Sequence, residues 1–236
     1  MIDQPSSSSF AQRLSHVQQR IHNACMRAER TPQDVTLVAV SKKHPTSTIQ
    51  EAYQAGLHNF GENYVQEWQQ KQDELQSYNT LRWHLIGPLQ RNKCKFVAGQ
   101  VDLIHSISKP ELITELDRRM PPQRTQRILL QCNLAQESQK SGFLQYENCL
   151  EAILQCPPSI QICGLMLIPP FSTKPESNRH LYRELRDWQQ RLQQQTTLPL
   201  QHLSMGMSHD FEMAIEEGAT LIRVGTALFG PRPQAE

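Results

Sequence analysis

The alternation of strand-like and helix-like segments constrains the fold of this chain more than any other feature. Eight short runs rich in apolar and β-branched residues recur between longer segments with helical periodicity. Regular alternation of this kind indicates βαβ units and a parallel sheet. The expected strands are 35–40, 57–61, 81–86, 101–107, 127–134, 160–168, 200–205 and 221–224.

Eight strand–helix units fit a closed (β/α)8 TIM barrel of the α/β class, near the small end of its usual size range. Apolar residues in steps of three and four over 10–30 predict an extra helix before the first strand. We therefore expect a flexible tail at 1–9 and a single barrel domain over 10–231. An open doubly wound sheet is the alternative, but the first strand is not followed by G-x-G-x-x-G.

Composition excludes several classes of function. The 24 basic and 23 acidic side chains give a net charge of +1, so no strong field favours nucleic acid or an anionic membrane. The chain has no run of 18 apolar residues and no basic, apolar leader at its start. The six cysteines contain no C-x-x-C pair, and with no export signal we expect them to be reduced thiols. We expect a cytoplasmic protein with no metal site.

The end of the first expected strand carries the first candidate for chemistry. The apolar run 35–40 stops abruptly at a serine, which Lys42 and Lys43 follow. A strongly hydrated lysine is unusual at the mouth of a buried strand, although two solvated loop lysines would also fit the pattern. Alternation places Lys42 on the face of Val38 and Lys43 on the face of Leu37, and does not choose between them.

The loops after the seventh and eighth expected strands form the second candidate. In TIM barrels the active site lies at the C-terminal ends of the strands, and a phosphate site often forms from these two loops. Ser204 and Ser208 offer hydroxyls before a helix start, and Gly225 and Thr226 offer backbone N–H groups. These residues predict an anion site, while Ser208 also suits a helix N-cap.

Two acidic residues set a condition on this anion site. Asp210 and Glu212 suit the start of a helix but would repel a phosphate. We therefore expect both side chains to point away from the anion.

A lysine and a phosphate anchor on one ring of loops suggest covalent chemistry. Lys42 falls at the end of strand one, on the same ring as the two phosphate loops. Burial lowers the pKa of a lysine and supplies the free amine that attacks a carbonyl. The combination predicts a Schiff base with a phosphorylated aldehyde.

At these residues the chain resembles the pyridoxal phosphate homeostasis proteins, formerly called the proline synthase co-transcribed family. The resemblance implies the barrel of the alanine racemase type (fold type III of pyridoxal phosphate proteins), without the second β domain of that enzyme. Its motifs occur in the family's order from about residue 10 to 231. They are AVSK at 39–42, FGENYVQE at 60–67, WHLIGPLQRNK at 83–93, KSG at 140–142, GLM at 164–166, LSMGMS at 203–208 and RVGTALFG at 223–230.

The resemblance implies that pyridoxal 5′-phosphate (PLP) is the cofactor and that Lys42 binds it covalently. It places Arg223 against the pyridine nitrogen and leaves Lys43 as a neighbour. The other cofactor-binding residues it implies are Ser204, Ser208, Gly225 and Thr226 at the phosphate, Asn63 and His84 near the ring, Met166 in the pocket wall, and Met205.

The residue pattern alone leaves simpler roles open for four of these residues. Asn63 could cap the helix that follows it, and Arg223 could form a surface ion pair. His84 could be a hydrogen-bonded core histidine, and Met166 could be an ordinary core residue.

Arg223 favours holding the cofactor over turning over an amino acid. Arginine only donates hydrogen bonds, so it would keep the pyridine nitrogen unprotonated and the ring a weak electron sink. We expect a non-catalytic PLP-binding protein of vitamin B6 homeostasis that affects the balance of amino acids and keto acids. Its expected partners are PLP-dependent apoenzymes, and the expected oligomeric state is a monomer. A minimal amino-acid racemase and a lysine-dependent aldolase are the alternatives.

Overall fold

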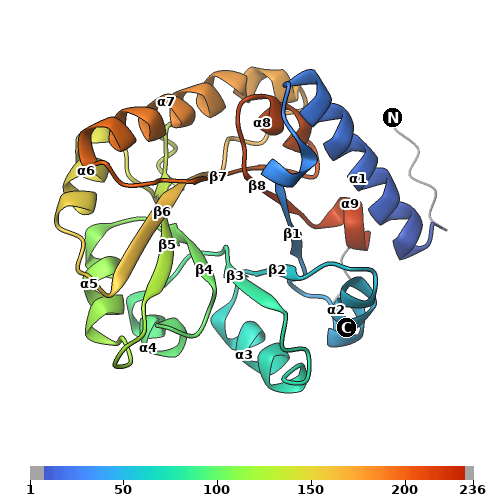
Figure 1. The fold of residues 1–236 in the computed structure, drawn as a ribbon, viewed down its shortest axis with the longest axis horizontal. Coiled ribbons are helices and arrows are strands. Elements are labelled where there is room, and N and C mark those ends of the chain that lie inside the picture. The colour runs from blue at the N-terminus through green and yellow to red at the C-terminus, as the bar shows by residue number, and fades with distance from the viewer. Residues whose placement is uncertain (1–7, 232–236) are drawn as a thin grey trace.

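The computed structural model describes residues 8–231, which fold around a closed parallel barrel (Figure 1). The strands are hydrogen-bonded in sequence order, and the last pairs with the first. The predicted eight-stranded barrel is therefore confirmed. Its strands are β1 (Thr36–Val40), β2 (Asn59–Glu62), β3 (Arg82–Leu85), β4 (Leu103–Ile107), β5 (Gln126–Cys132), β6 (Ile160–Leu167), β7 (His202–Met207) and β8 (Leu221–Val224).

Helical segments connect consecutive strands and surround the barrel. A further short helix, α9, lies beyond the final strand and is not among the elements expected from the sequence. The α-helices are α1 (Phe10–Arg27), α2 (Thr46–Gln54), α3 (Val65–Glu74), α4 (Cys94–Val97), α5 (Pro110–Arg118), α6 (Tyr146–Leu154), α7 (Arg179–Thr196), α8 (Phe211–Glu216) and α9 (Thr226–Phe229). Short 3₁₀ segments are η1 (Pro32–Asp34), η2 (Arg91–Lys93) and η3 (Pro175–Asn178).

The pleat and register of β1 set the height of the site residues inside the barrel. Side chains alternate along a strand, so Val38 and Val40 share the inward face and the same face continues to Lys42. The register pairs Val38 with Arg223 of β8. Lys42 therefore lies nearer the C-terminal mouth of the barrel than Arg223 does.

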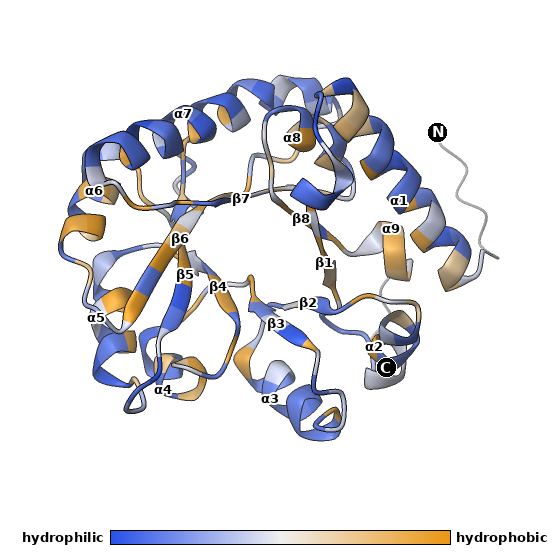
Figure 2. Cartoon of the chain, viewed as in Figure 1, coloured by the Kyte–Doolittle hydropathy of each residue, from blue (hydrophilic) through white to orange (hydrophobic). Residues whose placement is uncertain are grey.

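Two apolar layers hold the barrel together. The larger one lies between the strands and the helices, whose outer turns are hydrophilic, as α7 shows in Figure 2. The smaller one lies inside the barrel, below the polar mouth. Its buried members are Val38, Leu103, Leu129, Cys163, Met166 and Leu221.

Helix α1 packs against α8 and α9 beside the barrel (Figure 1). Ser9 and Gln12 form a capping box at its start, and residues 1–7 of the expected tail lie outside the described residues. Phe10 stacks on Phe229 with ring centroids 5.7 Å apart, and Arg13 Nε donates to the Leu228 carbonyl at 2.6 Å. The extra helix thus fixes the segment that follows β8.

In the part of the chain that the structure describes, no helix combines the length and apolar character needed to cross a membrane. All six cysteines are free, and all but Cys156 are buried.

Candidate functional site

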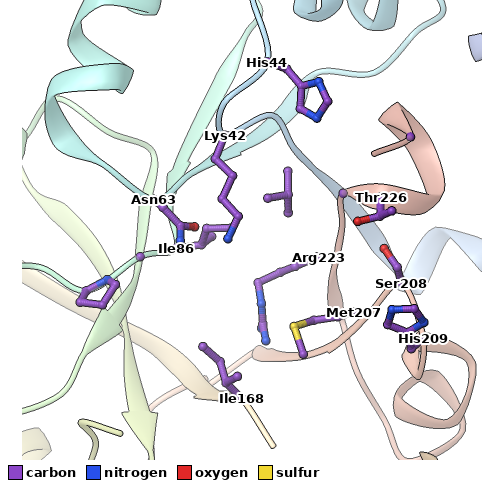
Figure 3. Close-up of a pocket in the computed structure, with 15 residues that line it drawn as sticks. Lys42, His44, Asn63, Ile86, Ile168, Met207, Ser208, His209, Arg223 and Thr226 are labelled. Atoms are coloured by element: carbon purple, nitrogen blue, oxygen red, sulfur yellow. The ribbon is translucent and has the colours of Figure 1, made fainter. Parts of the chain in front are cut away.

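A cavity of about 310 Å³ opens at the carboxyl ends of the barrel strands. Its volume falls at the lower end of the range of small-molecule sites. Figure 3 shows Lys42 and Asn63 on one side, Ser208 and Thr226 on the other, and Arg223 between them. The lining residues are Val40, Lys42, His44, Asn63, Ile86, Gly87, Pro88, Ile168, Met207, Ser208, His209, Arg223, Gly225, Thr226 and Gly230.

The loop after β1 directs Lys42 into this cavity and turns Lys43 away from it. Lys42 continues the inward face of Val40, whereas the exposed Lys43 lies outside the lining. Lys43 has a φ of +63°, a left-handed conformation that reverses the chain, and its N–H donates to Glu67. Strand alternation does not choose between Lys42 and Lys43, and the turn places Lys42 in the cavity.

A buried ion cluster fastens the same loop to α3. Lys71 Nζ lies 2.8 Å from the Ser41 carbonyl, 2.7 Å from Glu62 Oε1 and 2.8 Å from Glu67 Oε1. Ser41 Oγ also donates to Glu62 Oε1, at 2.7 Å. Burial raises the pKa of Glu62, while the adjacent ammonium of Lys71 opposes that rise. This Lys71 cluster holds the backbone on the amino side of Lys42.

The cavity floor is formed by Arg223, which is only 4% exposed. Its Nη1 donates to Ser204 Oγ at 2.5 Å and its Nη2 donates to the Leu167 carbonyl at 2.8 Å. Burial lowers the pKa of Arg223 to about 10, so the guanidinium stays protonated at neutral pH. The floor therefore carries a fixed positive charge.

Below the floor, two histidines cross the barrel interior. His105 Nδ1 lies 2.8 Å from Ser204 Oγ, and His105 Nε2 lies 2.9 Å from His84 Nδ1. His84 Nε2 in turn lies 3.1 Å from Asn59 Oδ1. Both rings are buried, and this burial lowers the pKa of His84 to about 3 and that of His105 well below 6.5. Both imidazoles are therefore neutral at pH 7.

We expect acid to destabilise the fold through these two histidines, beginning near pH 6.5. Below that pH the unfolded chain protonates both imidazoles while the folded barrel, with its lowered pKa values, does not. Each histidine should then reduce the free energy of unfolding by up to about 1.4 kcal/mol per pH unit. Urea unfolding between pH 7.5 and 5 measures this slope.

The matched variant for this measurement is His105→Asn, which removes one buried imidazole and should flatten the slope. Other titrating groups cancel in the difference between the two proteins. Equal slopes for the native chain and the variant would contradict the expectation.

On the opposite side of the cavity, Ser208 and Thr226 present hydroxyls. The Ala227 N–H donates to Ser208 Oγ at 3.3 Å and ties the loop after β7 to the loop after β8. Asp210 is occupied elsewhere: its carboxylate accepts from the Tyr182 hydroxyl at 2.7 Å and from the Met207 N–H at 2.6 Å. Asp210 is not among the lining residues, so its carboxylate lies outside the cavity.

The second acidic residue of this loop also points outward. Glu212 pairs with Arg20 of α1 at 2.7 Å. Among the described residues, the cavity lining contains one lysine, one arginine and no carboxylate. The donor set therefore suits an anion. No group of described residues could hold a metal ion.

Close backbone contact fixes Asn63 at the rim of the cavity. A Cβ on Gly87 would lie 2.3 Å from the Asn63 carbonyl oxygen, so only glycine permits this approach. The loops after β2 and β3 are thus packed directly on each other.

Six of the residues proposed from the sequence meet in the cavity, and four lie elsewhere. Lys42, Asn63, Ser208, Arg223, Gly225 and Thr226 belong to the lining. The remaining four are His84, Met166, Ser204 and Met205.

Each of the four residues outside the lining is fully packed. His84 and Ser204 lie under Arg223 in the hydrogen-bonded interior, and Met166 lies in the apolar layer below. Met205 is adjacent to the inward-facing Ser204, so the pleat places it outside the barrel among the helix-packing residues.

Two lining residues, His44 and His209, are absent from the site predicted from the sequence. His44 returns to the cavity because of the left-handed turn at Lys43, and its ring lies 5.3 Å from that of Phe229. The alternation of side chains along a strand does not predict that His44 lines the cavity. For His209, the available signal is its place directly after Ser208.

Sequence comparisons describe which proteins the chain is similar to. The profile of the family described as alanine racemase, N-terminal domain, matches residues 14–233. The pyridoxal phosphate homeostasis protein of Aquifex aeolicus is 44% identical over 225 residues, which cover 94% of this chain and 97% of the relative. The protein of the same name from Escherichia coli K12 is 38% identical over 230 residues, which cover 95% and 97%.

Solved structures share the barrel. PipY of Synechococcus elongatus, solved with PLP bound, has 39% sequence identity and a TM-score of 0.81, and the match covers 94% of this chain and 100% of that chain. Alanine racemase from E. faecalis has 16% identity and a TM-score of 0.60, covering 94% of this chain and 59% of that one. At 16% identity the second likeness concerns the fold alone.

Proposed function

The chain belongs to the pyridoxal phosphate homeostasis protein family, and from this premise we propose that it binds PLP in the cavity at the carboxyl ends of its strands. One observation carries the proposal. A lysine amine and a pair of hydroxyls face each other across a buried guanidinium in one cavity that has no carboxylate in its described lining. PLP combines an aldehyde, a ring nitrogen and a phosphate, which match these three groups.

Lys42 supplies the covalent attachment in this proposal. Its amine would hold the cofactor through the aldehyde carbon, in a condensation that would release one water and need no further reactant. The turn at Lys43 and the Lys71 cluster hold the Lys42 backbone so that its side chain enters the cavity. When bound, PLP supplies an aldehyde carbon that reacts with amines.

The remaining lining residues position the cofactor. Ser208, Gly225 and Thr226 receive the phosphate, and Asn63 lies beside the ring. Arg223 donates to the pyridine nitrogen, and because arginine only donates, that nitrogen stays unprotonated.

An unprotonated ring is a weak electron sink, which favours storage and release of PLP over turnover of amino acids. The proposed role is therefore homeostasis of PLP in the cytoplasm, by a monomer that exchanges the cofactor with PLP-dependent apoenzymes. The alternative is a minimal racemase. Racemisation of an amino acid by the purified protein, lost in Lys42→Ala, would favour that alternative.

The proposal is tested by comparing PLP with pyridoxal, which carries the same aldehyde but no phosphate. Absorbance titration should give a lower dissociation constant for PLP. Ser208→Ala should weaken PLP binding about tenfold, the effect of one hydrogen bond to a charged group, and leave pyridoxal binding unchanged. Equal affinities for the two aldehydes, or no binding of either, would overturn the proposal.

A further inference from the structure

A hydrogen-bonded chain of side chains runs through the barrel interior from Arg223 through Ser204, His105 and His84 to Asn59. The donor at its first bond sets the direction of donation along this hydrogen-bonded chain. Arginine only donates, so Ser204 Oγ accepts from Arg223 Nη1 at 2.5 Å. Among the described residues, the other hydrogen-bond partner of this hydroxyl is His105 Nδ1, 2.8 Å away, so we assign the single Ser204 hydroxyl proton to that bond. This assignment leaves His105 Nδ1 unprotonated and places the proton of the ring on Nε2.

The same reasoning fixes the second histidine. His105 Nε2–H donates to His84 Nδ1 at 2.9 Å, which leaves the His84 proton on Nε2. That N–H donates to Asn59 Oδ1 at 3.1 Å. Every bond runs from Arg223 toward Asn59, and one neutral tautomer of each ring satisfies the whole chain. The lowered pKa values of both imidazoles agree with this assignment.

The hydrogen-bonded chain reaches the cavity floor only at its Arg223 end. Arg223 lines the cavity, whereas Ser204, His105 and His84 lie outside its lining and are at most 6% exposed. Apolar side chains of the inner layer, such as Leu103 and Met166, share this interior, so an unsatisfied polar group there would be costly. The barrel nevertheless holds four consecutive polar side chains behind one guanidinium.

We propose that His105 is a positioning residue, which acts through Ser204 to hold the Arg223 guanidinium in the orientation that meets the cofactor's ring nitrogen. The contact of Arg223 with the ring nitrogen rests on the proposed function. The direction of the hydrogen-bonded chain does not depend on it. His105 draws the Ser204 proton toward its Nδ1 and so makes the Ser204 oxygen a stronger acceptor for Nη1. The Leu167 carbonyl holds Nη2 at 2.8 Å, and these two anchors fix the guanidinium plane.

The guanidinium has five N–H donors, and these two anchors use only two of them. The others are available to a ligand in the cavity above. Without His105, the Ser204 hydroxyl loses its acceptor and is free to rotate, and one anchor of Arg223 weakens.

The first test uses the protein without added cofactor. Nitrogen-15 NMR of the imidazoles should show the Nε2–H tautomer at both His105 and His84 at pH 7. An Nδ1–H tautomer or an imidazolium at His105 would overturn the proposal. This result does not depend on whether PLP binds.

The second test compares His105→Leu, His105→Asn and Leu103→Ala with PLP bound. Leu103 is the matched control, because it faces the same barrel interior from the same strand, β4, but its apolar side chain takes no part in the hydrogen-bonded chain. His105→Leu should shift the absorbance maximum of bound PLP and weaken its binding about tenfold. His105→Asn, whose amide oxygen can accept from Ser204, should restore the native maximum.

Leu103→Ala should lower the melting temperature but keep the native absorbance maximum. An unchanged maximum and affinity in His105→Leu, or the same spectral shift in Leu103→Ala, would overturn the positioning role. If His105→Leu does not fold, the tautomer measurement and the spectrum of Ser204→Ala decide, since Ser204→Ala should shift the maximum in the same way. Failure of the native protein to bind PLP would overturn the proposed function and leave the tautomer test standing.

Discussion

Replacing Lys42 with alanine is expected to abolish covalent retention of PLP and to leave the barrel folded. Lys42 is the lysine in the cavity lining, and it is partly exposed at the mouth, so its truncation removes no core packing. Borohydride reduction of the PLP-treated protein, followed by mass spectrometry of its peptides, should find the cofactor on Lys42 in the native chain and on no peptide of Lys42→Ala.

Lys43→Ala is the matched control for this experiment. Lys43 is the neighbouring lysine, but the turn at its own φ of +63° leaves its exposed side chain outside the lining. The control should retain full labelling at Lys42. Labelling of Lys43 in the native chain, or retained labelling in Lys42→Ala, would show that the attachment site lies elsewhere.

The barrel could be predicted from sequence because its elements follow from local periodicity. Period-two and apolar runs separated by helical segments leave few ways to bury every strand, and a closed parallel sheet is the one found. Helix α9 escapes prediction because its four residues are too few for a helical period. Its position depends on tertiary contacts with α1, such as the stacking of Phe10 on Phe229.

The sequence could predict which site residues face the inside of the barrel, but not how far below the mouth each of them lies. Strand alternation identifies inward residues such as Ser204 and His84, yet their height depends on strand tilt and register, which no local pattern contains. Both lie below the cavity floor, where Ser204 contacts Arg223 and His84 contacts His105. Met205, in contrast, is excluded by alternation alone, because its neighbour Ser204 faces inward.

The contribution of Lys71 to the site has no sequence signal at all. It is one of several polar residues on α3, and the pattern predicts an ordinary solvated lysine. Only the packing of α3 against the end of β1 brings its ammonium to the Ser41 carbonyl and to the buried Glu62. A residue that supports a catalytic or binding lysine from another element is visible only in three dimensions.

Lys71→Met is therefore expected to reduce the free energy of unfolding by about 3–5 kcal/mol at pH 7, the usual effect of leaving a buried charge unpaired. Glu62 is fully buried and its Oε2 already has no partner, so the lost ammonium would not be replaced. Urea unfolding measures the change, with the exposed Lys174→Met as the matched control at less than about 0.5 kcal/mol.

The double variant Lys71→Met with Glu62→Gln separates the charge from the packing. Removing both charges should recover part of the stability, because glutamine needs no counter-ion in the same site. The loss in Lys71→Met should also shrink toward pH 5, since burial already raises the pKa of Glu62 and a protonated Glu62 does not need Lys71. If Lys71→Met costs no more than Lys174→Met, the cluster does not hold the loop of Lys42, and the placement of that lysine depends on the turn at Lys43 alone.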